Sequence, residues 1–228
     1  MRQLPRARAL LFDLDGTLVD SKRDIALACN FALLQLGRPA QEEDAIARYV
    51  GDGARNLLAR ALGAAPDGPH VELALEFFQA FYAEHAADHT TWMPGAVEAL
   101  DALDDRPLGL VTNKPRPATL AVLRTLGALD RFATIVAGGD GPLKPDPRSI
   151  QAALRGLPTA MRPEDTWVVG DGPQDILAGR AAGCTTVAIS GGFASDAALA
   201  QAKPDVTLGS LLPLIALVRA NDRAPVAE

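Results

Sequence analysis

Short apolar runs that alternate with helical patterns constrain the fold of this 228-residue chain more than any other feature of its sequence. Each run is bounded by Gly, Pro or charged residues, which is typical of buried strands in a parallel sheet. The runs lie at residues 9–14, 107–112, 133–137, 166–170, 185–190 and 205–208. Helical patterns lie between them at residues 115–126, 147–154, 174–182 and 211–220. This order predicts a doubly wound, Rossmann-like α/β sheet with helices on both faces.

Residues 20–90 interrupt this alternation, because no strand pattern occurs there and four helical patterns follow one another. Ser21 and Asp24 predict a capping box before an apolar helix face that ends at Gly37. Further helices are predicted at residues 42–50, 54–62 and 70–87. We therefore expect a helical unit of residues 20–90 inserted into an α/β unit of residues 1–19 and 91–228.

Composition and charge restrict the partners of the chain. With 22 basic and 28 acidic residues, the formal net charge of −6 argues against nucleic acid or an anionic membrane as the main partner. No apolar stretch reaches the length of a membrane span, and the apolar run after the first arginines is too short for a signal peptide. Cys29 and Cys184 form no disulfide framework. These features predict a cytoplasmic protein, either a monomer or a homodimer.

Two carboxylates, Asp13 and Asp15, follow the first apolar run within the segment FDLDGTLVD. Strand alternation places both on one side, and the carboxyl ends of strands in open α/β sheets are where ligands bind. Like-charge repulsion beside four apolar residues calls for a cation or a shared proton. This pair is the strongest sign of a functional site.

A second acidic pair, Asp171 and Asp175, follows the run at 166–170. Carboxylates from two strand ends predict a hard-oxygen site suited to Mg²⁺ and completed by a substrate phosphate. Taken alone, Asp175 is also consistent with an ordinary acid in the first turn of a helix.

Two further segments suggest anion binding. Thr112 and Asn113 end a strand before a proline-started helix, so a hydroxyl and backbone N–H groups there can hold a phosphate, although both residues are also common in turns. Lys144 precedes Pro145 in a neighbourhood with few charges. A surface lysine is the alternative.

Together these four segments resemble the motifs of the haloacid dehalogenase-like phosphohydrolases, in the same chain order. The matching motifs are an Asp-x-Asp-Gly-Thr at residues 13–17, a strand ending in Thr112, a Lys-Pro at Lys144, and a Gly-Asp-x-x-x-Asp at residues 170–175. The resemblance covers the whole chain, since this family places a small helical cap directly after its first motif. One departure is Gly172-Pro173, where relatives often carry a hydroxyl residue after the first Asp.

The resemblance implies a two-step phosphoryl transfer. Asp13 would be the nucleophile that forms an aspartyl-phosphate, and Asp15 the general acid and base. Lys144 would balance the charge of the transferring group, and Asp175 would be a supporting carboxylate. The cofactor would be Mg²⁺, held by Asp13, Asp171 and the main-chain oxygen of Asp15.

The loop YVGDGARN resembles the substrate-facing loop of the phosphoglycolate phosphatase subgroup, which makes Gly51, Gly53 and Arg55 candidate substrate residues. Arg55 or Lys114 would meet the carboxylate of 2-phosphoglycolate, a small phosphomonoester. The alternatives are a phosphatase for another sugar phosphate or nucleotide, a phosphomutase, and a non-catalytic binding protein. His85 and His89 are expected on a solvated helix face, not in a zinc site.

Overall fold

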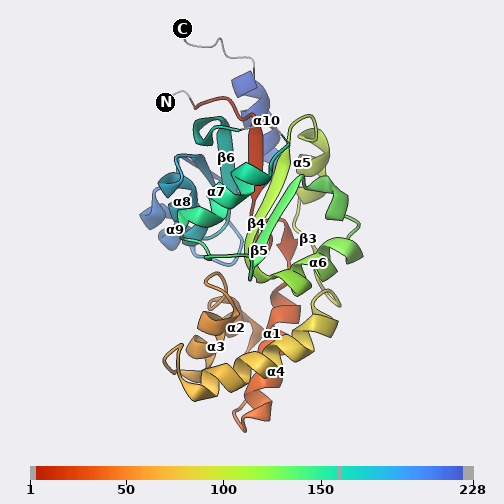
Figure 1. The fold of residues 1–228 in the computed structure, drawn as a ribbon, viewed down its shortest axis with the longest axis vertical. Helices are drawn as coiled ribbons and strands as arrows, with labels where there is room; N and C mark the ends of the chain where they lie inside the picture. The colour runs from red at the N-terminus through yellow and green to blue at the C-terminus, as the bar shows by residue number, and fades with distance from the viewer. Residues whose placement is uncertain (1–3, 159–160, 223–228) are drawn as a thin grey trace.

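The computed structural model describes residues 4–158 and 161–222. Its main sheet has six parallel strands in the order β5-β4-β1-β6-β7-β8 (Figure 1). The strands are β1 (Ala9–Phe12), β4 (Leu108–Pro115), β5 (Thr134–Gly138), β6 (Thr166–Gly170), β7 (Thr185–Ile189) and β8 (Val206–Leu208). Each corresponds to one predicted apolar run, so the doubly wound α/β fold is confirmed. Because β1 lies between β4 and β6, the residues that follow it reach the middle of the carboxyl edge.

Helices cover both faces of this sheet, and side chains of β1 alternate between the two layers. Leu10 and Phe12 pack in the layer of α5 (Ala96–Ala102), α6 (Arg116–Thr125) and α10 (Leu212–Asp222). Ala9 and Leu11 pack on the other face, which α7 (Pro147–Gly156), α8 (Pro173–Ala181) and α9 (Asp196–Ala202) cover. Burial on both faces explains why β1 reads as a continuous apolar run. Two short 3₁₀ helices lie in the connections before β5 and before β6. They are η1 (Leu129–Arg131) and η2 (Pro163–Asp165).

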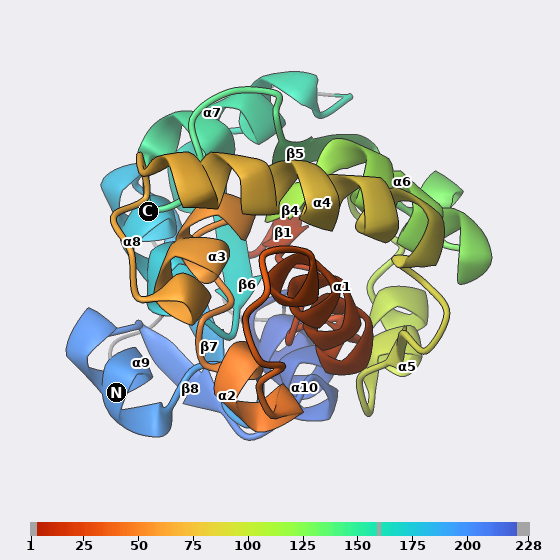
Figure 2. The same cartoon turned by 90° about the horizontal axis from the view of Figure 1, so that it is seen from below.

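Four helices stand beyond the carboxyl edge of the sheet, at the lower end of the molecule in Figure 1 and facing the viewer in Figure 2. They are α1 (Lys22–Gln35), α2 (Glu43–Ala47), α3 (Ala54–Leu62) and α4 (Pro69–His85), and we call them the helical cap. Two chain segments connect the cap to the main sheet. They pair with each other through two short antiparallel strands, β2 (Val19–Asp20) and β3 (Thr91–Trp92). Among the described residues, no helix has both the length and the apolar character needed to cross a bilayer.

The predicted capping box at the start of α1 is wrong. Ser21 occupies the N-cap position, but its Oγ donates to Oδ1 of Asp15 at 2.6 Å and makes no cap bond. The Asp24 carboxylate is buried and accepts hydrogen bonds from the N–H of His89 (3.0 Å) and the hydroxyl of Thr90 (2.7 Å). Asp24 therefore fixes the connection after α4 to the first turn of α1.

The prediction that His85 and His89 are exposed to solvent is confirmed, since 42% and 38% of their side chains are exposed, but the helix assignment is wrong for His89. This residue lies beyond the end of α4, and its Nδ1 is 2.8 Å from Oδ1 of Asp24. His85, the last residue of α4, has its Nδ1 2.8 Å from Asp88. Each histidine therefore pairs with a carboxylate and remains exposed to solvent.

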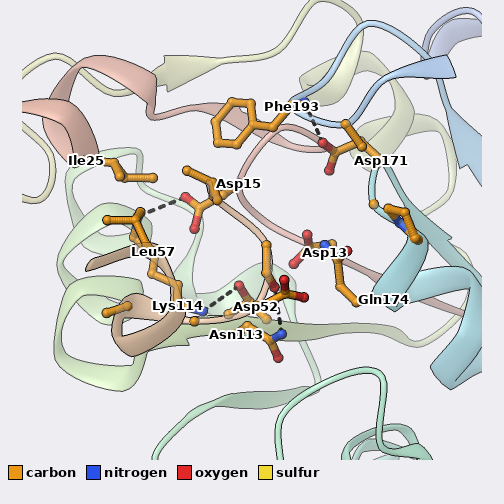
Figure 3. Close-up of a pocket in the computed structure, with 18 of the residues that line it drawn as sticks. Asp13, Asp15, Ile25, Asp52, Leu57, Asn113, Lys114, Asp171, Gln174 and Phe193 are labelled. Carbon is orange, nitrogen blue, oxygen red and sulfur yellow. Dashed lines mark hydrogen bonds and ion pairs between the residues drawn. The ribbon is translucent and has the colours of Figure 1, made fainter. Parts of the chain in front are cut away.

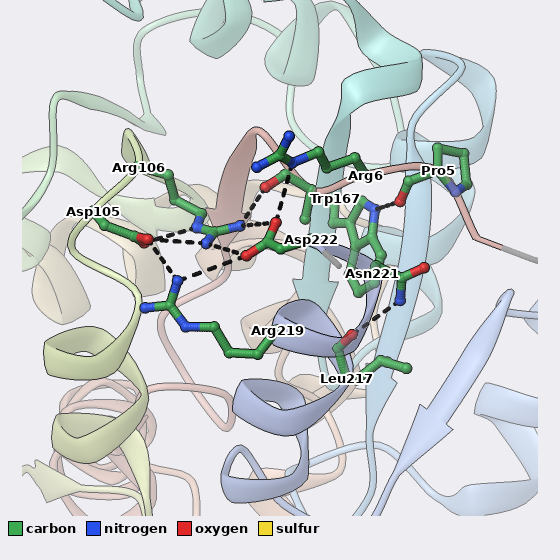
Figure 4. A network of polar contacts seen from close by, with 10 residues as sticks. Pro5, Arg6, Asp105, Arg106, Trp167, Leu217, Arg219, Asn221 and Asp222 are labelled. Atoms are coloured by element: carbon green, nitrogen blue, oxygen red, sulfur yellow. Dashed lines mark hydrogen bonds and ion pairs between the residues drawn. The ribbon is translucent and has the colours of Figure 1, made fainter. Parts of the chain in front are cut away.

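A polar network joins α10 to the opposite, amino-terminal end of the sheet (Figure 4). The guanidinium of Arg106 donates to the carbonyl of Ala7 (2.6 Å) and to Oδ2 of Asp222 (2.8 Å). Arg219 donates to Oδ2 of Asp105 at 2.5 Å. The last described turn of the chain is thus attached to the segment before β4.

Candidate active site

A cavity of about 520 Å³ lies between the carboxyl edge of the sheet and the helical cap. Figure 3 shows the side chains of Asp13, Asp15 and Asp171 facing this cavity. The residues around it come from strand ends on one side and from α1, α3, α4 and the loop before α3 on the other. We call the loop before α3, residues 48–53, the cap loop. It is far from the strand-end motifs in the sequence, yet it lines the same cavity.

Asp13 directly follows β1, and its carboxylate is paired with a buried lysine. Nζ of Lys144 is 2.8 Å from Oδ1 of Asp13 and 2.6 Å from Oδ1 of Asp175. The same Nζ donates to the carbonyl of Val111 at 2.5 Å. The Lys144 side chain is 2% exposed, so it is no surface lysine. Although burial favours the neutral amine, the charges of Asp13 and Asp175 raise the pKa of Lys144 above its usual value.

Asp171 and Asp175 are held by donors from three segments. Oδ1 of Asp171 accepts from the hydroxyl of Thr17 (2.7 Å), and its Oδ2 accepts from the N–H of Phe193 (2.7 Å). Oδ2 of Asp175 accepts from the N–H of Gly172 at 2.9 Å. The donor to Asp175 is a backbone group, so this contact does not need the hydroxyl residue that relatives often carry at position 172.

Gly16 allows the loop after β1 to approach Asp171. Its φ is +85°, and a Cβ at this position would lie 2.3 Å from Oδ2 of Asp171. A side chain there would therefore need both a strained backbone and a displaced carboxylate.

Three carboxylates, those of Asp13, Asp171 and Asp175, have oxygens within 4.8 Å of one another. Burial, reinforced by the charges of Asp175 and Asp171, raises the pKa of Asp13 to about 8 even though Lys144 opposes it. Burial and Asp175 raise the pKa of Asp171 to about 6. One ammonium does not relieve three crowded carboxylates, whereas a divalent cation would, and all the ligand atoms are hard oxygens. The cluster therefore fits a metal ion.

Asp15 is fixed through one of its two carboxylate oxygens. Oδ1 accepts from Nζ of Lys114 at 2.8 Å and from the hydroxyl of Ser21 at 2.6 Å. Nζ of Lys114 also donates to the hydroxyl of Tyr82 on α4 and lies 4.7 Å from the centre of its ring. Oδ2 of Asp15 makes no hydrogen bond within the described part of the chain, which leaves it open to a ligand.

The predicted phosphate residues Thr112 and Asn113 both line the cavity. Oγ1 of Thr112 accepts from the N–H of Lys114 at 3.2 Å. Both amide protons of Asn113 are used, because Nδ2 donates to the carbonyls of Gly51 (2.7 Å) and Lys144 (2.8 Å). Its side chain is thus unable to donate to a phosphate, and the predicted contact is left to its main chain.

Only two of the three predicted substrate residues of the cap lie at the cavity. Gly51 and Gly53 line the cavity, but Arg55 does not. Instead, the Arg55 guanidinium is 2.7 Å from Glu72 on α4, with 43% of its side chain exposed. The cationic cap residues that do line the cavity are Arg48 and Arg60. A sequence pattern that marks the start of α3 does not specify which face of that helix meets the cavity.

Several site residues were not predicted as such. Thr17 lies inside the first motif, so the motif itself was a signal for it. Tyr82 belongs to the apolar stripe of α4, which indicates core packing. Gln174 and Phe193 line the cavity from the start of α8 and from the loop after β7. The position of that loop after a strand was a usable signal for Phe193.

Comparisons with known proteins agree with this arrangement. A family model described as haloacid dehalogenase-like hydrolase matches residues 10–189. The phosphoglycolate phosphatase of Chromobacterium violaceum is 36% identical over 95% of this chain and 98% of its own length. That of Pectobacterium atrosepticum is 34% identical over 99% of this chain and 100% of its own. The crystal structure of a predicted phosphoglycolate phosphatase from Haemophilus somnus 129PT, 28% identical, covers 95% of this chain and 99% of that one, with a TM-score of 0.81.

Proposed function

The chain belongs to the haloacid dehalogenase-like hydrolase family, and from that premise we propose that it is a phosphatase that hydrolyses 2-phosphoglycolate through an aspartyl-phosphate. The observation that carries the phosphatase activity is the contact of Nζ of Lys144 with the carboxylate of Asp13 at the floor of the cavity. A carboxylate beside a fixed ammonium is suited to attack a phosphoryl group whose negative charge that ammonium offsets.

In the first step, a carboxylate oxygen of Asp13 attacks phosphorus and the bond from phosphorus to the substrate oxygen breaks. Lys144 lies within reach of both Asp13 and Asp175, so its position does not depend on the substrate. The ammonium offsets charge on the transferring group as the bond breaks. The product of this step is the phosphorylated carboxyl group of Asp13 and an alcohol.

Asp15 supplies the proton that the leaving oxygen needs. Its Oδ1 is held by Lys114 and Ser21, so Oδ2 is the oxygen that would face the leaving group. In the second step Asp15 takes a proton from water, which attacks phosphorus, breaks the bond to Asp13 and releases inorganic phosphate. The carboxylate of Asp13 is regenerated.

We include Mg²⁺ as the cofactor, which Asp13, Asp171 and the main-chain oxygen of Asp15 would hold with Asp175 in support. The crowded carboxylates described above are the support for this assignment. When bound, this ion neutralises charge on the phosphoryl oxygens. Thr17 and the N–H of Phe193 would orient Asp171 toward it.

The substrate assignment rests on the curated relatives named phosphoglycolate phosphatase, whose similarity extends over the chain. A phosphatase for a larger sugar phosphate or nucleotide is the second candidate. The observation in its favour is the cavity itself, whose volume of about 520 Å³ and apolar wall residues Leu57, Leu177 and Phe193 would accommodate a larger leaving group.

Phosphate release from a panel of esters tests the proposal. The panel holds 2-phosphoglycolate, hexose phosphates, nucleoside monophosphates and p-nitrophenyl phosphate, each with Mg²⁺. We expect 2-phosphoglycolate to have the highest kcat/KM, and a higher value for a hexose phosphate would favour the second candidate. Isomerisation of a hexose phosphate without phosphate release would indicate a mutase. The Asp13→Asn variant controls for contaminating phosphatase and is expected to be inactive.

The domain division and the location belong to the same proposal. Residues 20–90 would act as a cap over a catalytic core of residues 1–19 and 91–228, since the cavity lies at their junction. The buried free thiols of Cys29 and Cys184 support a reducing compartment such as the cytoplasm.

A further inference from the structure

One side chain, Asn113, contacts both the cap loop and the loop that carries Lys144. Its Nδ2 donates to the carbonyl of Gly51 at 2.7 Å and to the carbonyl of Lys144 at 2.8 Å. Its Oδ1 accepts from the N–H of Lys144 at 2.8 Å. Gly51 and Lys144 are 62 and 31 residues away from Asn113 in the chain. A single amide therefore joins the end of β4 to the cap loop and to the loop that carries Lys144.

The two loops also touch directly. Gly53 has φ +85°, and a Cβ on it would lie 2.8 Å from Cδ1 of Leu143, the residue before Lys144. The backbone of Gly53 in the cap loop therefore lies closer to the Leu143 side chain than a residue with a Cβ atom would allow. Asn113 is buried at this junction, with 8% of its surface exposed. Because a buried amide without partners is costly, its three hydrogen bonds favour one arrangement of both loops.

The position of Lys144 matters for the reaction proposed above. Its backbone N–H and carbonyl are both bonded to Asn113, while its Nζ reaches Asp13 and Asp175. A displacement of the cap loop would break the bond from Asn113 to Gly51, and the amide, then held only by its two bonds to Lys144, could shift together with the Lys144 backbone. We propose that Asn113 is a positioning residue that couples the seating of the cap loop to the placement of the Lys144 ammonium beside Asp13. This role rests on the proposed phosphatase function.

The isosteric variant Asn113→Asp tests this coupling. It keeps the oxygen that accepts from the Lys144 N–H, but it replaces the two donated bonds with repulsion between oxygens. We expect hydrogen exchange in residues 49–53 and at the amides of Leu143 and Lys144 to accelerate at least tenfold together. We also expect kcat for p-nitrophenyl phosphate to fall at least tenfold while KM changes less than threefold, because Lys144 balances charge on the transferring group.

Asn30→Asp is a matched control from within the cap. Asn30 makes the same kind of bridge, since its Nδ2 donates to the carbonyl of Gln41 (2.9 Å) and its Oδ1 accepts from the N–H of Gln41 (2.8 Å). We expect faster exchange around residues 30 and 41, unchanged exchange at Leu143 and Lys144, and kcat within twofold of the wild type.

Two outcomes would overturn the coupling. One is Asn113→Asp with unchanged exchange at Leu143 and Lys144 despite faster exchange at 49–53, and the other is an unchanged kcat in the same variant. If Asn113→Asp does not fold, Arg60→Ala makes the comparison from the cap side, because Arg60 contacts the Tyr49 carbonyl and the Asp52 carboxylate on either side of Gly51. Unchanged exchange of the Lys144 N–H would then contradict the coupling. An inactive wild type would instead refute the phosphatase function, and the exchange data would still decide the coupling.

Discussion

The ammonium of Lys114 lies 2.8 Å from Oδ1 of Asp15, and it also donates to the hydroxyl of the cap residue Tyr82. Lys114 has 1% of its side chain exposed and Asp15 has 10%. Although burial favours the neutral amine, Asp15 and Tyr82 raise the pKa of Lys114 above its usual value, so it stays charged. The group proposed to transfer the proton is therefore oriented by a cation that depends on the cap.

Lys114→Met should impair proton transfer more than phosphoryl transfer. The loss of one charged hydrogen bond, about 1.5–3 kcal/mol, predicts a decrease in kcat of roughly 10- to 100-fold for 2-phosphoglycolate. In the first step the decrease should be much smaller for p-nitrophenyl phosphate, because nitrophenolate leaves without a proton, whereas the second step needs Asp15 with either ester. Pre-steady-state release of the alcohol from both esters checks this, and Tyr82→Phe, which keeps Lys114, should have a weaker effect. Equal losses in the first step for the two esters would show that Lys114 does not act through Asp15.

In the metal-free protein, the three crowded carboxylates should make stability fall as pH rises. The folded state holds a proton on Asp171 up to a pKa of about 6 and on Asp13 up to about 8, whereas unfolded aspartate titrates near 3.9. Between about pH 4 and pH 8 the folded state thus binds more protons than the unfolded state, and the free energy of unfolding decreases with pH. Melting curves in EDTA measure this.

Two comparisons isolate the carboxylates from other titrating groups. Asp13→Asn removes one charge, so its Tm in EDTA should exceed that of the wild type by an amount that grows from pH 5 to pH 8. Mg²⁺ should raise the wild-type Tm more at pH 8 than at pH 5, because protons compete for the same oxygens. A Tm difference that does not change with pH would contradict this account of the cluster.

Gly16→Ala should weaken metal binding through Asp171. The added Cβ would lie 2.3 Å from Oδ2 of Asp171, so the carboxylate must move away from its place in the cluster. We expect the Mg²⁺ concentration for half-maximal activity to rise at least tenfold. Gly37→Ala is the matched control, because Gly37 also has a positive φ, +66°, with nothing within 4 Å of an added Cβ. It should cost about 1–2 kcal/mol of backbone strain and leave the Mg²⁺ dependence unchanged.

The sequence was sufficient to predict the six strands of the main sheet, and also that the acidic residues after two of them lie close together. Parallel strands share one carboxyl edge, so Asp13 and Asp171, each directly after a buried run, were expected to converge there, whereas only the family resemblance assigned Lys144 to the same site. The helices α5 and α9 were not predicted, because each spans seven residues and is rich in alanine, which leaves little apolar periodicity.

The contacts across the cavity were beyond a sequence-based prediction for a physical reason. Asn113 bonds to backbone atoms of Gly51 and Lys144, and backbone atoms have no sequence signature. Tyr82 has the spacing of a core residue and is in fact buried, but its hydroxyl also reaches Lys114. Arg55 was assigned to the substrate because of its place after two glycines, whereas the rotation of α3 directs it to Glu72.

Arg106→Met should lower stability without affecting catalysis, because its network lies at the end of the sheet away from the cavity (Figure 4). The Arg106 side chain is 8% exposed and bonds to Ala7 and Asp222, so its loss should cost about 2 kcal/mol. For a chain of this size that corresponds to roughly 4–8 °C in Tm.

The stability lost in Arg106→Met should also depend on pH, because Arg106 lowers the pKa of Asp222. The loss should be complete above about pH 4, the pKa of an unfolded aspartate, and should shrink in more acidic solution as the carboxyl of Asp222 is protonated in the folded state. Differential scanning fluorimetry between pH 3 and pH 8 measures both effects, with the exposed Arg148→Met as a control that should shift Tm by less than about 2 °C. A deficit of the same size in an Asp222→Asn background would place the contribution of Arg106 in its bond to Ala7 instead of in the ion pair with Asp222.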